Sequence, residues 1–113
     1  ARNDYYDKNK PVLEKIIRGW AEANDYLIAN TDKALQAIQS KHYPQVPLAD
    51  IKEQYAAQKM FTSAEWAKLY ADGSVTKWLQ RVSDFFIDFA KIPNATPASS
   101  YFDPKLYQNV IKP

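Results

Sequence analysis

The chain has 113 residues, of which 46% are hydrophobic and 14% aromatic, a composition that excludes the disordered class of sequence. Its 15 Lys and Arg residues are interleaved with 13 Asp and Glu residues and leave a formal net charge of +2, whereas nucleic-acid binding needs cations clustered on one face. No nucleic-acid partner is expected, and the absence of cysteine excludes disulfides, thiol catalysis and Cys-based zinc sites.

Two consecutive helices are predicted in the first third of the chain. A three-and-four spacing of apolar residues predicts a helix from about Lys10 to Ala29, with Pro11 suited to its first turn. A second helix is expected to begin at Thr31, whose side chain can cap it, and to end near His42. Before them, residues 1–5 are at most the trailing end of a strand.

The middle of the sequence predicts two shorter helices. One is expected to begin at Pro47 and to end near Met60. Thr62 and Glu65 match the capping box, in which each side chain bonds the backbone N–H of the other residue, and they predict the start of the next helix. Gly73 is expected to stop it.

The clearest periodicity follows Ser74, where apolar residues repeat at three-and-four spacing and predict a helix that faces a core. With Trp20 from the first long helix, these residues form the predicted structural core: Trp20, Val75, Trp78, Leu79, Val82, Phe85, Phe86 and Phe89. After a loop at residues 93–100, Asp103 as a cap and Pro104 at the first helical position predict a last helix through Ile111.

No segment alternates apolar and polar residues for long enough to predict a confident strand. The isolated chain is therefore predicted to be all-α, with about six helices, and residues 1–113 to form a single helical unit. No apolar run approaches the ~20 residues that a membrane span needs, so no membrane span is expected. The first residues have no hydrophobic signal region, and any secretion signal is expected to lie outside this sequence.

The side chains give little support to catalysis. His42 is the only histidine, so neither a Ser-His-Asp triad nor a site with several histidines can be built. Asp84 and Asp88 lie one turn apart, and a solvated helix face is favoured over a metal site. No catalytic residue, metal site or cofactor is predicted, and we do not expect an enzyme.

Aromatic residues are the other candidates for a site. The three tryptophans, Trp20, Trp66 and Trp78, occupy the apolar registers of their helices, so core packing is favoured over stacking on a ligand. Four tyrosines are less constrained, and one of them could reach a pocket: Tyr5, Tyr6, Tyr101 and Tyr107.

A family resemblance rests on several stretches in the same order and spacing. They are residues 3–11, which run into the first predicted helix within the stretch 8–34, then residues 46–51, residues 86–93, and residues 101–104 with their Asp-Pro pair. The sequence resembles the C-terminal helical part of the solute-binding proteins of ABC importers, in the family that takes nitrate, sulfonates, taurine and thiamine precursors. Departures are Lys10 directly before Pro11 and Gly19 inside the first long helix.

The resemblance implies a two-lobed α/β periplasmic-binding-protein parent that closes over a small solute and docks on the ABC permease. This chain would be a fragment that braces one lobe, with the solute, the permease and the remainder of the parent chain as its partners. It implies a periplasmic or extracytoplasmic location in a secreted or lipid-anchored parent. The ligand-binding residues stay unknown, because the loops that line the pocket would lie largely upstream of Ala1.

The alternative is a free-standing helical module whose aromatic surface binds a protein partner. The two hypotheses differ in the surface that they leave exposed. A fragment is expected to expose a large apolar patch where the missing part packed, whereas a self-sufficient domain covers its apolar stripes.

Overall fold

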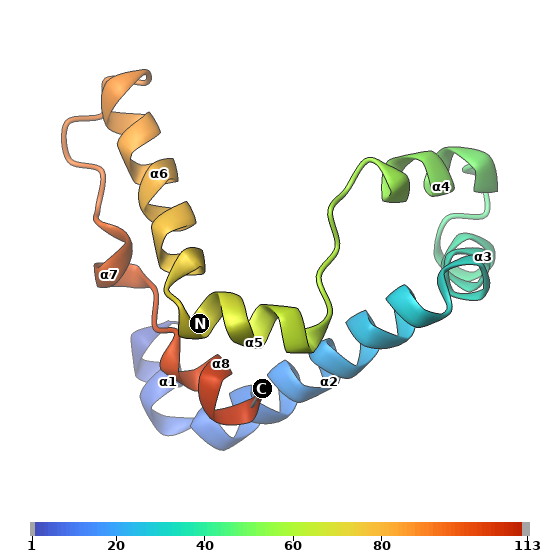
Figure 1. Cartoon of the computed structure of the whole chain (residues 1–113), viewed down its shortest axis with the longest axis horizontal. Helices are drawn as coiled ribbons and strands as arrows, with labels where there is room; N and C mark the ends of the chain where they lie inside the picture. Colours follow the sequence, from blue (N-terminus) through green and yellow to red (C-terminus); the bar gives the residue numbers. More distant parts are fainter. Residues whose placement is uncertain (1, 112–113) are drawn as a thin grey trace.

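Residues 2–111 are described in the computed structural model, and every regular element among them is an α-helix (Figure 1). The helices are α1 (Asn3–Lys8), α2 (Lys10–Ala29), α3 (Thr31–His42), α4 (Leu48–Ala56), α5 (Ser63–Ala71), α6 (Ser74–Asp88), α7 (Ala98–Tyr101) and α8 (Lys105–Val110). The prediction of an all-α chain is confirmed, with eight helices in the described residues where about six were expected.

The helices form an open frame with two arms. Helix α2 contacts α1, α5 and α8, which form the base with it in Figure 1, and it also contacts α3. At one end α3 continues into α4, and at the other α5 leads into α6, which contacts α5 and α7 but neither α3 nor α4 within the described residues. The Cα radius of gyration is 17.1 Å, whereas a compact chain of this length has about 13 Å.

The interior of this frame is built mainly from small side chains. The buried apolar residues are Ala21, Ala34, Leu35, Ala67, Val75, Ala98, Leu106 and Tyr107. Among the described residues no large side chain is fully buried. Small residues let the helices approach closely, but they remove little apolar surface from water. The helices therefore meet at points rather than around one large core.

The predicted core is wrong for most of its members within this chain. Of the eight residues, Val75 is buried and Leu79 is partly buried. The other six are exposed to these fractions: Trp20 50%, Trp78 38%, Val82 51%, Phe85 54%, Phe86 43% and Phe89 76%. The physical reason is the open frame, because the segment that returns from α6 borders Val82 and Phe86 but leaves Phe85 and Phe89 uncovered. That another part of a larger protein covers them stays a prediction.

Helices α2 and α3 begin and end at the predicted residues, but the predicted cap between them is wrong. Asn30 is the N-cap residue of α3, and no side chain caps it. The Thr31 hydroxyl instead donates backward to the carbonyl oxygens of Leu27 and Ile28, at 3.1 Å each. Thr31 thus satisfies the last carbonyls of α2 rather than the first N–H groups of α3.

Helix α4 ends at Ala56, earlier than the predicted Met60. The chain then extends so that the Phe61 carbonyl accepts a hydrogen bond from the Asn24 side chain of α2 at 2.8 Å. The predicted capping box is confirmed: the Glu65 N–H donates to Thr62 Oγ1 at 3.2 Å, and the Thr62 N–H donates to Glu65 Oε2 at 2.7 Å. Gly73 ends this region with a φ of 78°, a left-handed conformation that favours glycine.

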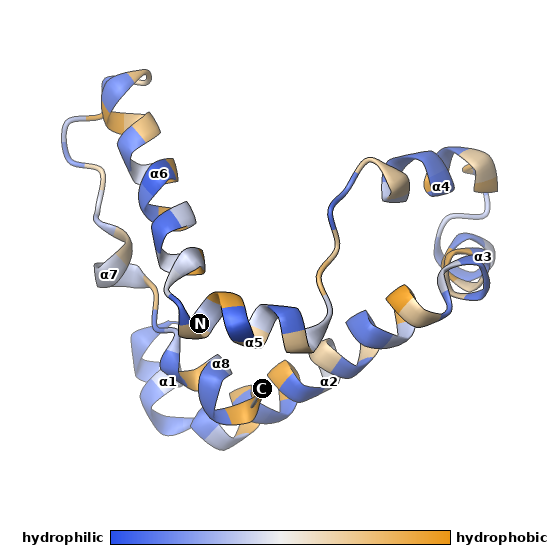
Figure 2. Ribbon diagram, in the orientation of Figure 1, coloured by the Kyte–Doolittle hydropathy of each residue, from blue (hydrophilic) through white to orange (hydrophobic). Residues whose placement is uncertain are grey.

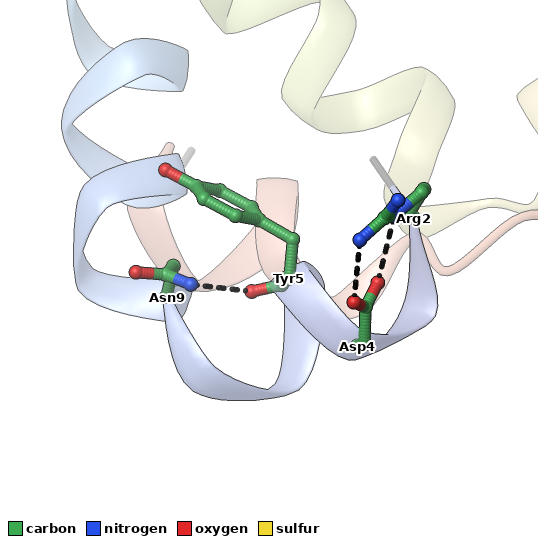
Figure 3. Close-up of polar contacts among 4 residues, drawn as sticks. All are labelled: Arg2, Asp4, Tyr5 and Asn9. Atoms are coloured by element: carbon green, nitrogen blue, oxygen red, sulfur yellow. Dashed lines mark hydrogen bonds and ion pairs between the residues drawn. The ribbon is translucent and has the colours of Figure 1, made fainter.

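Two short helices were not predicted. Residues 3–8 form α1 instead of a strand end, and its start is held by two hydrogen bonds from the Arg2 guanidinium to Asp4, at 3.0 and 2.7 Å (Figure 3). Asn9 Nδ2 donates to the Tyr5 carbonyl at 3.0 Å and closes its C-terminal end. Helix α7 lies at the end of the expected loop, because the Ala98 N–H donates to Gln80 of α6.

The last predicted helix is present but shorter at both ends. Helix α8 begins at Lys105, and Pro104 stands before it as the N-cap residue instead of inside the first turn. Asp103 contributes as predicted, since its Oδ1 accepts the Lys105 N–H at 2.9 Å.

Candidate functional site

Helix α6 has a polar side that the chain itself covers. The Gln80 Oε1 accepts the Ala98 N–H at 3.0 Å, and the buried Ser83 hydroxyl donates to the Thr96 carbonyl at 2.9 Å. The segment that returns from the end of α6 is therefore fastened to its polar side. A chain that closes its own core covers the apolar side of its helices, whereas here much of the apolar side of α6 stays open.

The open side carries the α6 stripe, defined as Trp78, Val82, Phe85, Phe86 and Phe89. Hydrophobic residues recur along α6 in Figure 2. The rings of Phe85 and Phe89 stack at 5.0 Å, and those of Phe85 and Phe86 meet edge to face at 6.0 Å. From their exposed fractions, the four aromatic residues alone expose about 400 Å². This area is comparable with the largest apolar patch on a typical monomer, and such patches are often contact surfaces.

An aromatic cluster anchors the first half of this helix to the base. The Trp78 ring lies 6.2 Å from the Phe61 ring and 6.4 Å from the Trp66 ring, and Phe61 meets Trp66 at 5.2 Å. Trp78 thus belongs to the cluster on one edge while it remains 38% exposed. Helix α6 is fixed at its N-terminal end, and its apolar C-terminal half extends away from the base.

A cavity of about 390 Å³ lies where α1, α2, α5, α7 and α8 meet. Three of the four candidate tyrosines line it, namely Tyr6, Tyr101 and Tyr107, while Tyr5 does not and is 46% exposed. Sequence reasoning missed the other lining residues, among them Tyr70 and Asp103. Only the residue types could have indicated them from the sequence. No local pattern does so, because residues such as Tyr6 and Asp103 come together from distant parts of the chain.

The polar contacts of this cavity shift the pKa of its groups. The Tyr6 hydroxyl donates to Asp103 Oδ2 at 2.6 Å, which lowers the pKa of the Asp103 carboxyl and raises that of Tyr6. The Tyr70 and Tyr107 rings stack at 4.1 Å. The Tyr107 hydroxyl is buried without a hydrogen-bond partner in residues 2–111, and burial raises its pKa to about 12. These contacts join the two ends of the chain.

A second cavity, of about 510 Å³, lies between α2, α3 and Met60 and is almost entirely apolar. Trp20 lines it, together with Leu27 and Ile38. The partly exposed Trp20 indole therefore borders this groove as well as touching the Tyr107 ring at 6.5 Å. The apolar groove is a further surface that the described chain leaves uncovered.

The remaining candidates stand alone on the surface. His42 lies exposed at the end of α3, and Asp84 and Asp88 are exposed on α6, where Asp84 accepts a hydrogen bond from Gln80 at 2.9 Å. Within residues 2–111 no three His, Asp or Glu side chains are grouped so that they could hold a metal ion. None of the described helices combines the length and the apolar character that crossing a membrane requires.

Comparison with known proteins relates the chain to binding proteins. Proteins of Brucella abortus, Brucella suis and Brucella melitensis, each named "Putative binding protein", are 30% identical to it over 102 residues. The match covers 90% of this chain and 31% of each relative, so the chain spans about a third of the length of the curated relatives that it matches. No family model and no solved structure matches the sequence.

Proposed function

We propose that this chain is the helical part of a solute-binding protein that delivers a small solute to an ABC importer. The observation that carries the proposal is the similarity over 90% of the chain to proteins named as binding proteins that are about three times as long. The resemblance of residues 3–11, 46–51, 86–93 and 101–104 to the nitrate, sulfonate, taurine and thiamine-precursor family supplies the finer hypothesis on the solute.

The open frame supports the view that this chain functions with further protein around it. Its accessible surface is 8406 Å², whereas a folded monomer of this mass exposes about 6,300 Å². The excess of about 2,000 Å² falls in the range that one partner buries in an obligate interface. The proposed parent is two-lobed, and its remainder would cover this surface.

The proposed role of the chain is mechanical. Helices α2, α5 and α8 form a base that would brace one lobe while the other closes over the solute by a hinge motion. The chain performs no chemistry in this proposal and needs no cofactor. The ABC permease is the proposed partner of the whole protein, which would be located in the periplasm or another extracytoplasmic space.

The test is a ligand panel on the longer polypeptide that contains this sequence. Nitrate, taurine, an alkanesulfonate, an aminopyrimidine thiamine precursor and a sugar as control are screened by thermal shift and then by calorimetry. A true ligand at 100 times its Kd stabilises the folded protein by about 2.7 kcal/mol. Stabilisation by one of the first four supports the proposal, and absence of binding by all small solutes tested contradicts it.

The alternative function is a free-standing helical module that binds a protein through the α6 stripe. The exposed fractions of Phe85 and Phe89 favour a contact surface of some kind. The alternative would be favoured if the 113-residue chain, expressed alone, were monomeric and did not bind any part of a longer polypeptide. Native mass spectrometry distinguishes the two.

A further inference from the structure

We infer that the α6 stripe is the seam through which this chain packs against an apolar face of the remainder of the longer protein. This inference rests on the proposed function and deepens it, because it names the residues that form the contact. The occupant is the rest of the same polypeptide, and neither a second copy nor an unrelated partner is needed.

The chain covers only part of the surface of α6 with its own residues. The returning segment contacts Gln80 and Ser83, which lie on the polar side of the helix, and its backbone groups are satisfied there. At 100° per residue the stripe lies on another side, and Val75 and Leu79 continue it toward the base. The same segment also borders Val82 and Phe86 across a cavity of about 380 Å³. Phe85 and Phe89 do not line that cavity, and the described chain leaves them mostly exposed.

Charge is distributed unevenly around α6. Every charged residue of α6 is exposed and lies outside the stripe: Lys77, Arg81, Asp84 and Asp88. The stripe spans about a third of the helix circumference, which is the width that a helix buries against a core. Because charged groups of both signs share the other side, the surface divides into one side for solvent and one for packing.

The exposed area of the stripe limits the kind of partner that can bind there. A stable association between separate molecules buries about 800 Å² on each partner, and the four aromatic residues of the stripe offer about half of that. A second copy paired through the stripe alone would therefore be weak. A contact within one polypeptide needs less area, because the connecting chain supplies a high effective concentration.

The relatives provide the extra chain that this argument requires. The matched segment covers 31% of their length, so more than two thirds of a comparable polypeptide lies outside it. An apolar lobe surface from that portion is the occupant with the chemistry to cover Phe85, Phe86 and Phe89.

The test compares Phe89→Ser in the 113-residue chain and in the longer polypeptide. Phe89 is 76% exposed here, so the substitution is expected to leave the unfolding constant of the isolated chain within about threefold of its original value. In the longer polypeptide, where the ring would be buried, the constant is expected to rise by about 100-fold or more. Lys77→Ser, at an exposed position about 120° around α6 from Phe89, is the matched control and should change neither.

Hydroxyl-radical footprinting of the unmodified proteins gives a second readout that does not depend on a variant folding. Oxidation of Phe85, Phe86 and Phe89 is expected to fall by at least about tenfold in the longer polypeptide. Equal oxidation in both, or protection that depends on the concentration of the isolated chain and so indicates a second copy, would overturn the inference. Neither measurement involves a solute. A negative result in the ligand panel is therefore distinguishable from a negative result on the contact through the α6 stripe.

Discussion

Asp25 and Asn24 show how two neighbouring side chains hold the middle of this chain in place. The Asp25 carboxylate accepts the Ser63 N–H at 2.7 Å and also the Ser63 hydroxyl, and so satisfies the first turn of α5. Asn24 donates to the Phe61 carbonyl two residues earlier. Together they fasten the extended segment before α5 to α2, a contact between residues nearly forty positions apart.

The first prediction concerns Asp25→Asn and pH. The Ser63 hydroxyl and N–H lower the pKa of Asp25 below its unfolded value, so the carboxylate contributes stability above about pH 4, which is lost as pH falls through the folded pKa. We expect the free energy of unfolding of the variant to be about 1 kcal/mol lower at pH 7 than that of the original protein. We also expect it to fall less than that of the original protein between pH 7 and pH 3. Urea unfolding at both values measures this difference, and identical acid losses would contradict it.

The second prediction concerns the buried hydroxyl of Tyr107. This side chain is 7% exposed, and its oxygen has no hydrogen-bond partner in the described part of the chain. Because Tyr107→Phe removes an unsatisfied polar group and keeps the stacking on Tyr70, we expect it to stabilise the fold by about 1 kcal/mol. Thermal unfolding measures the change.

Tyr101→Phe is the control for that experiment. The Tyr101 hydroxyl lies 3.3 Å from Ser83 Oγ and 3.4 Å from the Leu79 carbonyl, so its removal should lower stability or leave it unchanged. A loss of stability in Tyr107→Phe would mean that its hydroxyl finds a partner that these contacts do not include.

At the scale of elements, the sequence predicted the helices whose signals are local. The three-and-four spacing predicted the bounds of α2, and the Thr62–Glu65 pair predicted the start of α5. Both signals could be recognised because each involves residues close together in the sequence. Helices α1 and α7 have six and four residues, too few for a periodic pattern, and α7 depends on Gln80, which lies 18 residues from Ala98.

Burial and the cavity could not be predicted in the same way. The period of α6 shows which side is apolar, but not whether another element lies over it. The same limit applies to the cavity, whose Tyr6–Asp103 hydrogen bond joins residues 97 positions apart. Such contacts depend on the path of the whole chain, and no local pattern in either segment indicates them.

The two glycines give the third prediction, in which one chemical change has opposite effects. A Cβ added to Gly19, inside α2, meets no atom within 4 Å, so Gly19→Ala is expected to stabilise the protein by about 0.5 to 1 kcal/mol. Gly73 has a φ of 78°, where a Cβ is strained, so Gly73→Ala is expected to cost about 1 kcal/mol or more. Thermal unfolding followed by circular dichroism compares them, and shifts of the same sign would contradict the assigned backbone conformations.

At the scale of the whole molecule, the balance between small buried residues and large exposed ones explains the shape. Alanine residues occupy four of the eight buried apolar positions, so the helices touch without enclosing a volume. The arms formed by α3–α4 and by α6–α7 make no contact with each other in the described residues, and each is attached to the base at one end. Nothing within the described chain draws the arms together.

The fourth prediction is that the isolated chain keeps this open shape in solution. A collapsed chain would have a radius of gyration of about 13 Å, whereas the open frame has 17.1 Å over its Cα atoms. The aromatic cluster of Phe61, Trp66 and Trp78 fixes α6 to the base, so closing the arms would require breaking it. Small-angle X-ray scattering on a size-exclusion peak, at several low concentrations, should therefore give about 17 Å or slightly more. A value near 13 Å would mean that the α6 stripe folds back onto the chain, and the seam with a larger protein would lose its structural basis.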